Sequence, residues 1–205
     1  KTKNKNKENL KFLDIGFSND NEYGFHLNLL RLLKETDYLT GIDLDLDFKK
    51  LKENDNIQKY NSQTEYKNIS IFDYSGNNKY DVVTMCEVFE HLPTPYKSLH
   101  KIYDFLKKDG LFIMTYPNPL THGRFIRYIK TKNVLNENYL KTYKGDVDHK
   151  VMPLPPSLIV YLQEVVGFRV IEVSYIRGNI MHSPLFRRLN LGKFNSHIGI
   201  VAVKV

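Results

Sequence analysis

Residues 79–93 read KYDVVTMCEVFEHLP, an apolar run that leads directly into a group of ionisable side chains. Residues 82–85 show almost no polar alternation, which is typical of a parallel strand covered on both faces. Glu87, Glu90 and His91 follow at spacings i, i+3 and i+4, so one helical turn would place them on the same face. Because ligands of open α/β sheets lie just outside the carboxyl ends of the strands, we expect a functional site here.

Segments suited to strands and to helices alternate along the chain. In addition to 82–85, strands are expected over residues 10–15, 38–44, 66–72, 111–115, 168–176 and 197–205, and helices over 26–33, 48–51, 95–106, 124–129 and 157–166. Pro95 suits a first helical turn, and residues 107–110 have the lysines and the glycine that commonly end a helix. This alternation predicts an α/β fold, a Rossmann-like, doubly wound and mainly parallel sheet of seven strands with helices on both faces.

The length of 205 residues and a hydrophobic content of 41% fit one domain that spans residues 1–205. Residues 1–9 are polar and are expected to be disordered. Residues 116–156 are rich in proline, aromatic and basic residues, and a loop of this length predicts a lid or substrate-binding insertion after the fifth strand. Residues 177–195 are expected to form a mobile basic loop.

The charge and the cysteine content limit which binding partners and which cellular compartment we expect. A net charge of +7 admits a nucleic-acid partner, but a solvated lysine surface is the simpler explanation. The single Cys86 excludes an intramolecular disulfide framework and is typical of a reducing compartment. No apolar run approaches the roughly 18 residues of a bilayer span, and no signal-peptide pattern is present. We therefore expect a cytoplasmic protein with no membrane partner.

Several motifs occur in a characteristic order. They are FLDIG at 12–16, GID at 41–43, YDVV at 80–83, EVFEHLP at 87–93, LKKDGLFI at 106–113, TYPN at 115–118, and DHK at 148–150 followed by a helix and Gly167. The ordered set resembles the class I S-adenosylmethionine-dependent methyltransferases over roughly residues 10–176. It is most similar to the branch that contains ubiquinone-pathway and sugar O-methyltransferases.

The resemblance implies S-adenosylmethionine as cofactor and suggests which residues bind it. Gly16 would form the tight turn beside the methionine part, and Asp43 would accept both ribose hydroxyls. Asn68 and Ile69 would flank the adenine, and Cys86 would offer its backbone to the methionine group. The complete expected set is Asp14, Gly16, Ser18, Asp43, Leu44, Asn68, Ile69 and Cys86.

Other interpretations of these residues stay open. Asp14 and Asp43 could be ordinary strand-end capping residues, and Cys86 a small buried hydrophobe. The glycine-rich loop also departs from the family pattern Gly-x-Gly-x-Gly, since residues 16–20 read GFSND. A non-catalytic module that binds S-adenosylmethionine is therefore one alternative function.

Methyl transfer to a hydroxyl also requires removal of a proton, so a base or a metal is expected. His149, at the end of the expected lid, is the first candidate for general base, and His91 and Glu90 are further catalytic candidates. Glu87, Glu90, His91 and His149 also resemble a metal set of some ubiquinone-pathway O-methyltransferases and of small-RNA 2′-O-methyltransferases. A divalent cation such as Mg or Mn could then chelate adjacent substrate hydroxyls.

The leading functional hypothesis is O-methylation of a small hydroxylated acceptor, such as a sugar or a phenolic or quinone precursor. An RNA ribose 2′-O-methyltransferase with a divalent metal is the second alternative, beside the non-catalytic module. The sequence determines neither the acceptor nor the oligomeric state.

Overall fold

The computed structural model describes residues 9–17, 25–118, 155–176 and 197–205. Four features expected from the sequence lie wholly or mainly outside these ranges: the disordered start, the short helix over 124–129, most of the insertion over 116–156 and the basic loop over 177–195. The predicted site residues Ser18 and His149 also lie outside the described ranges.

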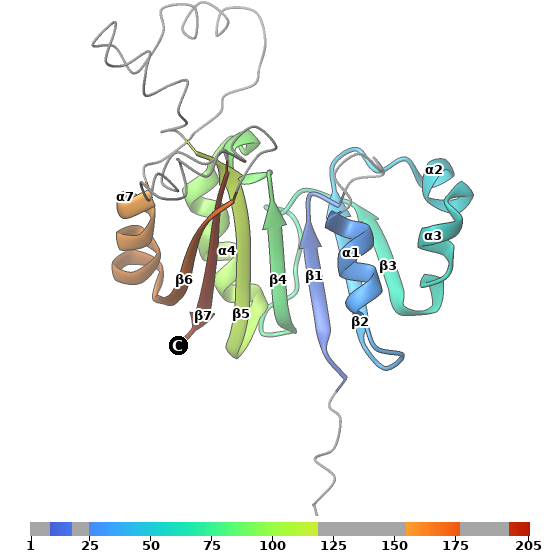
Figure 1. Ribbon diagram of the computed structural model, residues 1–205, viewed down its shortest axis with the longest axis horizontal. Helices are drawn as coiled ribbons and strands as arrows, with labels where there is room; N and C mark the ends of the chain where they lie inside the picture. The colour runs from blue at the N-terminus through green and yellow to red at the C-terminus, as the bar shows by residue number, and fades with distance from the viewer. Residues whose placement is uncertain (1–8, 18–24, 119–154, 177–196) are drawn as a thin grey trace, which may run out of the picture.

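A seven-stranded sheet forms the centre of the fold, in the order β3-β2-β1-β4-β5-β7-β6 (Figure 1). The strands are β1 Lys11–Ile15, β2 Tyr38–Asp43, β3 Thr64–Asn68, β4 Tyr80–Cys86, β5 Leu106–Pro117, β6 Phe168–Ile176 and β7 His197–Lys204. The pairs among β1 to β5 are parallel, whereas β7 runs antiparallel to both β5 and β6. The predicted mainly parallel sheet of seven strands is confirmed.

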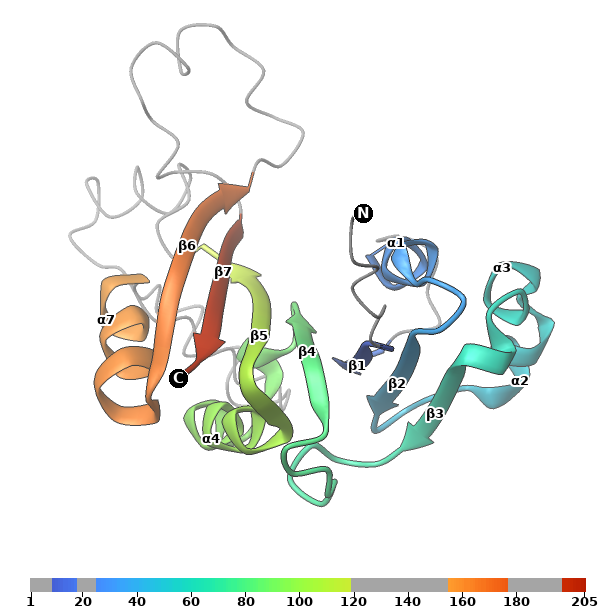
Figure 2. The same ribbon diagram turned by 90° about the horizontal axis from the view of Figure 1, so that it is seen from below.

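Helices cover both faces of this sheet (Figure 2). They are α1 Phe25–Leu32, α2 Phe48–Glu53, α3 Asp55–Gln58, α4 Pro95–Phe105, and α7 Pro155–Val160, which continues into a π-helical segment, η3 Tyr161–Val166. In Figure 2, α1 lies on one side of the sheet and α4 on the other, which is the doubly wound arrangement expected from the sequence. None of the helices within the described ranges has the length and apolar character needed to cross a bilayer.

Each face of the sheet has its own hydrophobic core. Leu30, Leu39 and Leu51 belong to the smaller core, which joins the sheet to α1 and α2. The larger core joins β4, β5 and β7 to α4 and η3 and includes the fully buried Phe105 and Leu162. Since a fully buried Leu or Phe stabilises a fold by roughly 1.5–3 kcal/mol, these cores hold the strand ends firmly in place.

The β4 stretch forms the predicted buried strand, with Val83 and Met85 inside the core. The helical turn expected directly after it is wrong. Glu87 has a φ of 57° and so lies in the left-handed region, and only Phe89–His91 form a short 3₁₀ turn, η2. Glu87, Glu90 and His91 therefore do not share one helical face.

Other element boundaries also differ from the expected ones. α4 ends at Phe105, and residues 106–110 belong to β5, whose register against β4 shifts between the Tyr80–Leu106 and Val82–Leu111 pairs. β3 ends at Asn68 rather than at residue 72, because the chain turns at Ser70, whose carbonyl accepts the Tyr74 N–H. The four-residue α3 was not predicted; so short a segment has little helical periodicity to detect.

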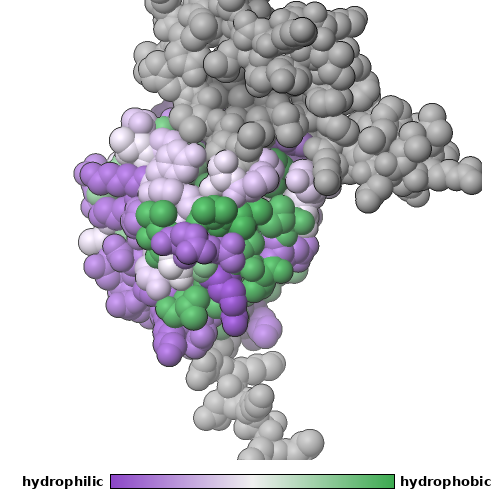
Figure 3. Space-filling model, turned by 90° about the vertical axis from the view of Figure 1, so that its left-hand side faces the viewer, coloured by the Kyte–Doolittle hydropathy of each residue, from purple (hydrophilic) through white to green (hydrophobic). Residues whose placement is uncertain are grey.

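Apolar side chains gather at the end of the molecule that α7 and β6 form (Figure 3). Val160, Val165 and Ile171 are among the exposed large hydrophobic residues there. β6 is an edge strand, and its register against β7 shifts between Val170 and Glu172, so Ile171 sits in a bulge. Such a bulge interrupts the edge and limits its pairing with a strand of another chain.

Candidate active site

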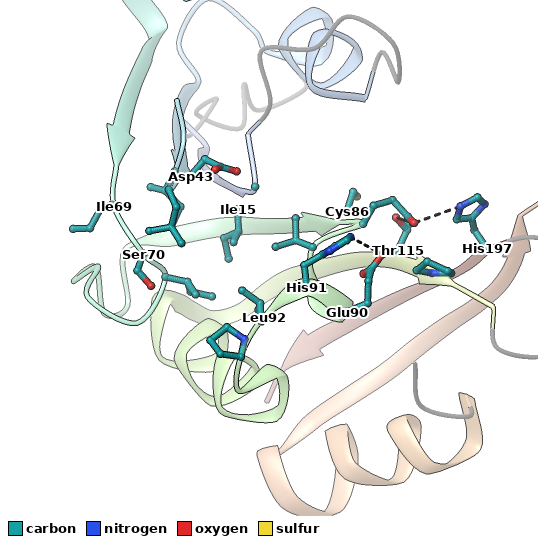
Figure 4. A pocket seen from close by; sticks show the side chains of 18 of the residues that line it. Ile15, Asp43, Ile69, Ser70, Cys86, Glu90, His91, Leu92, Thr115 and His197 are labelled. Atoms are coloured by element: carbon teal, nitrogen blue, oxygen red, sulfur yellow. Dashed lines mark hydrogen bonds and ion pairs between the residues drawn. The ribbon is translucent and has the colours of Figure 1, made fainter. Parts of the chain in front are cut away.

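A cavity of about 830 Å³ lies at the carboxyl ends of the parallel strands, beside the segments that follow β1 and β4 (Figure 4). It extends from Asp43 on β2 to His197 at the start of β7. Its walls are contributed by strand ends and by the segment after β4, namely Ile15, Gly16, Ile42, Asp43, Leu44, Ile69, Ser70, Ile71, Cys86, Glu87, Val88, Glu90, His91, Leu92, Pro93, Thr115, Pro117, Ile176 and His197. The cavity occupies the position that the sequence predicted, outside the end of β4.

Gly16 allows two segments to approach each other at the cavity wall. Its φ is +80°, and a Cβ added there would lie 2.0 Å from Val88 Cγ2. The Gly16 and Phe17 N–H groups both donate to the Ile42 carbonyl, at 2.9 and 3.2 Å. The chain therefore turns tightly from β1 over the end of β2, and only glycine suits this position without strain.

Asp14 lies beneath this turn and outside the cavity lining. Its side chain is fully buried, and its Oδ1 accepts a hydrogen bond of 2.6 Å from Thr84 Oγ1 on β4. A buried carboxylate bonded in this way joins the two central strands. The structure thus places Asp14 where it can orient the Gly16 turn, without reaching the cavity surface.

Cys86 lines the cavity between the two halves of the sheet. Burial, followed by the negative charge of Asp14, raises the pKa of its thiol to about 12. Since the thiolate is the reactive form of cysteine, this side chain is a neutral wall residue rather than a nucleophile at physiological pH.

We therefore expect Cys86 to resist alkylation. At pH 8 its reaction with iodoacetamide should be at least about 100-fold slower than that of a free cysteine, because so little thiolate is present. Cys86 is the single cysteine of the chain, so mass spectrometry of the intact protein reports on it alone. The same protein unfolded in guanidinium should react at the ordinary rate, and fast labelling of the folded protein would contradict the expectation.

Both side-chain and backbone acceptors form the hydrogen bonds that shape the Asp43 end of the cavity. Asp43 Oδ1 accepts the Asp45 N–H at 3.0 Å, and the Asp43 carbonyl accepts the Ile69 N–H at 2.8 Å. Asn68 Oδ1 accepts the Leu46 N–H at 2.8 Å, so this amide faces the β2–α2 connection and lies outside the lining. Of the predicted cofactor residues at this end, Asp43, Leu44 and Ile69 line the cavity.

The opposite end of the cavity contains two separate pairs of ionisable side chains (Figure 4). Glu87 Oε2 lies 3.4 Å from His197 Nε2, and Glu87 Oε1 accepts a hydrogen bond of 2.7 Å from Thr115 Oγ1. Glu90 is almost fully buried, and its Oε1 lies 3.8 Å from His91 Nε2. All four ionisable side chains line the cavity, although Glu87 faces β5 and β7 rather than its sequence neighbours.

The predicted metal set is not supported. Across the described ranges, no group of three or more His, Cys, Asp and Glu side chains is arranged to hold a metal ion. The physical reason is the left-handed backbone at Glu87, which turns its carboxylate away from the Glu90–His91 pair. His149, the fourth predicted ligand and the first candidate for general base, lies outside the described residues.

His197 and Thr115 were missed by the sequence analysis. His197 is the first residue of β7, and only the antiparallel direction of that strand brings its beginning to the carboxyl edge of the other strands. The sequence marks 197–205 as a strand but does not reveal its direction. The position of His197 at the start of a predicted strand was the one feature of the sequence that could have indicated it as a site residue.

Solved structures of known proteins share this fold. An S-adenosylmethionine-dependent methyltransferase from Mesorhizobium loti is 12% identical with a TM-score of 0.64, over 95% of this chain and 91% of that chain. A second one, from Archaeoglobus fulgidus, is 19% identical with a TM-score of 0.58, over 96% and 86%. The [4+2]-cyclase SpnF is 12% identical with a TM-score of 0.63, over 96% and 75%. At such low identities the likeness shows the fold alone, and one fold can host different reactions.

The sequence supports the same likeness. Residues 24–112 match the sequence profile of a family described as a methyltransferase domain. No curated protein sequence gave a significant match to this chain.

The cavity fits S-adenosylmethionine, the cofactor that a methyltransferase domain implies. Its volume of about 830 Å³ is within the range of small-molecule sites. Gly16 allows the tight turn at the centre of the wall, because Val88 occupies the space that a Cβ would need. Asp43 presents a carboxylate at one end, and apolar residues such as Ile69 and Ile71 provide a wall beside it.

Proposed function

We propose that this protein is an S-adenosylmethionine-dependent methyltransferase that transfers a methyl group to a hydroxyl of a small acceptor, such as a sugar or a phenolic or quinone precursor. One observation carries the proposal. The cavity has a single carboxylate, Asp43, at one end and the two ionisable pairs, Glu87 with His197 and Glu90 with His91, at the other. The first end suits a ribose, and the second suits a hydroxyl that must lose its proton.

At the cofactor end, the residues of the chain bind and orient. Asp43 retains acceptor capacity for ribose hydroxyls, since a carboxylate has about four lone-pair sites and the Asp45 N–H uses one of them. Ile69 and Ile71 offer apolar contact to a flat base. S-adenosylmethionine, when bound, supplies a methyl group on a sulfonium that is already a good leaving group, so the protein's task is mainly positioning.

The acceptor end of the cavity contains both apolar and ionisable residues. Leu92, Pro93 and Ile176 form apolar wall that suits a ring, and the carboxylates and imidazoles can accept a hydroxyl proton. A site with this composition favours a small acceptor that is bound by a few polar groups within a largely apolar cavity.

The two alternatives have less support. The RNA ribose hypothesis depended on the metal set, which the described residues do not form, and on basic loops that lie outside the described ranges. The non-catalytic module was suggested by the altered glycine loop. Gly16 nevertheless keeps the tight turn and the positive φ that the family's loop requires, which favours cofactor binding.

Calorimetry and a turnover assay test the proposal. We expect the full chain to bind S-adenosylhomocysteine. We also expect it to convert S-adenosylmethionine into S-adenosylhomocysteine when catechol or UDP-glucose is supplied as the acceptor probe. A short RNA with a free 3′ end tests the RNA alternative in the same assay. Absence of cofactor binding by the folded protein would refute the proposal, and binding without turnover on any probe would favour the non-catalytic module.

A further inference from the structure

We propose that His197 is the general base of the methyl transfer and that Glu87 is its positioning residue, an inference that rests on the proposed O-methylation. Neither residue was assigned this role from the sequence. The inference depends on three features: the placement of His197, the conformation of Glu87, and the contact between them.

His197 is held at the cavity by strands on both sides. Its backbone pairs with Pro117 at the end of β5 and with Ile176 at the end of β6, so the ring projects from a fixed strand position. The side chain lines the cavity at the end opposite Asp43 (Figure 4). About 41% of it is exposed, which leaves the imidazole accessible to a bound acceptor.

Glu87 occupies an unfavourable backbone conformation and is fixed there by Thr115. A φ of 57° is uncommon for a residue with a Cβ, and such conformations are often found at functional sites. The Glu87 N–H donates to the Thr115 carbonyl at 3.0 Å, and Thr115 Oγ1 donates to Glu87 Oε1 at 2.7 Å. This conformation aims the second carboxylate oxygen at His197, 3.4 Å away.

A carboxylate beside an imidazole favours the protonated ring and restricts its orientation. In the reaction, the acceptor hydroxyl transfers its proton to the neutral His197 ring as the oxygen–methyl bond forms and the sulfonium carbon–sulfur bond breaks. The products are a methyl ether, a neutral thioether and an imidazolium, so the single positive charge moves from sulfur to His197. Glu87 stabilises that imidazolium, which later releases its proton to solvent.

Several other titratable groups lie near His197 on the surrounding segments. Glu90 and His91 line the same cavity from the segment after β4, and Cys86 stays neutral because burial raises the pKa of its thiol. Tyr116 on β5 is also neutral, since burial raises the pKa of its phenol, and Tyr175 precedes Ile176 on β6. Among the described groups around His197, Glu87 is the carboxylate at ion-pair distance from the ring.

NMR of the labelled histidine rings in the full chain tests the contact directly. Glu87→Gln should change the ring nitrogen signals of His197 at a fixed pH, because the carboxylate that lies 3.4 Å from Nε2 is replaced by a neutral amide. His100, an exposed histidine on α4 that contacts the Tyr161 hydroxyl, is the matched control and its signals should not change. His197→Asn and His100→Asn identify the two sets of signals. Unchanged His197 signals, or an equal change at His100, would overturn the positioning role of Glu87.

Kinetics on the probe that the wild-type protein methylates, catechol or UDP-glucose, test the base. His197→Asn should lower kcat at least about 100-fold and remove the acidic limb of the pH profile, while affinity for S-adenosylhomocysteine stays within about threefold. His100→Asn should change neither quantity. Glu87→Gln should lower kcat about 10-fold and leave the acceptor KM within about threefold, because Glu87 acts by orienting His197. A loss smaller than 100-fold in His197→Asn would overturn its role as base.

Failure of this inference and failure of the proposed function can be told apart. If the protein binds S-adenosylhomocysteine but the His197 ring signals do not respond to Glu87→Gln, the inference alone is overturned. If the ring signals respond but the cofactor does not bind, the proposed function is overturned while the Glu87–His197 contact stands.

Discussion

Replacing Asp43 with alanine should weaken the binding of S-adenosylhomocysteine by about 100-fold. Hydrogen bonds to a charged group each contribute roughly 1.5–3 kcal/mol, and the loss of two to the ribose hydroxyls corresponds to about 3 kcal/mol. The Asp43 carboxylate lines the cavity and accepts the Asp45 N–H. Because the substitution removes this one exposed hydrogen bond, the stability of the fold should change little. Isothermal titration calorimetry measures the dissociation constant.

Two further variants make this result specific to Asp43. Asp43→Asn keeps the size and an acceptor oxygen, so its loss should be intermediate if negative charge contributes to the hydrogen bonds. Asp45→Ala removes a neighbouring exposed carboxylate that is not part of the lining and retains the backbone N–H bonded to Asp43. Equal losses in Asp43→Ala and Asp45→Ala would mean that general charge, rather than a ribose contact, explains the effect.

Replacing Gly16 with alanine should destabilise the fold by at least about 2 kcal/mol and also impair cofactor binding. The left-handed conformation costs a residue with a Cβ roughly 1–2 kcal/mol, and overpacking adds a comparable amount. The new Cβ would lie 2.0 Å from Val88 Cγ2, so Val88 must move, and Val88 is itself part of the cavity wall. Denaturant unfolding measures the first effect and calorimetry the second.

A double-mutant cycle separates the two causes. In a Val88→Ala background, Gly16→Ala should cost about 1 kcal/mol less, because the clash is relieved while the backbone strain remains. Gly199→Ala is a suitable control, since its Cβ would meet only the flexible end of Ile176 at 3.2 Å and no positive φ is involved. A Gly16→Ala protein as stable as wild type would show that the β1 turn does not require glycine.

The features that the sequence predicted well are those set by local pattern. The apolar run of β4, the stripe of α4 and the position of Gly16 after β1 each depend on a few adjacent residues, and each was found where expected. Alternation of strands and helices then leaves few topologies for the sheet, so the class of fold follows. Asp43 at the end of β2 reached the cavity for the same reason.

The features that the sequence could not predict depend on contacts between distant segments. The pairing of Leu106 with Tyr80 on β4 starts β5 at the expected end of α4. The bond of Asn68 to the Leu46 N–H removes that amide from the cavity wall. The largest error came from Glu87, whose helical spacing with Glu90 and His91 was overridden by a left-handed backbone held by Thr115, 28 positions later in the chain.

The placement of β7 has a consequence for the order in which the protein assembles. β7 follows β6 in the chain, yet it lies between β5 and β6 and supplies β6 with its sheet partner among the described strands. During synthesis, β6 therefore emerges before the strand that it needs, and the sheet must wait for β7 to insert. His197 enters the cavity in that same step, so a nascent chain can fold its Asp43 half early but acquires the proposed base only when β7 completes the sheet.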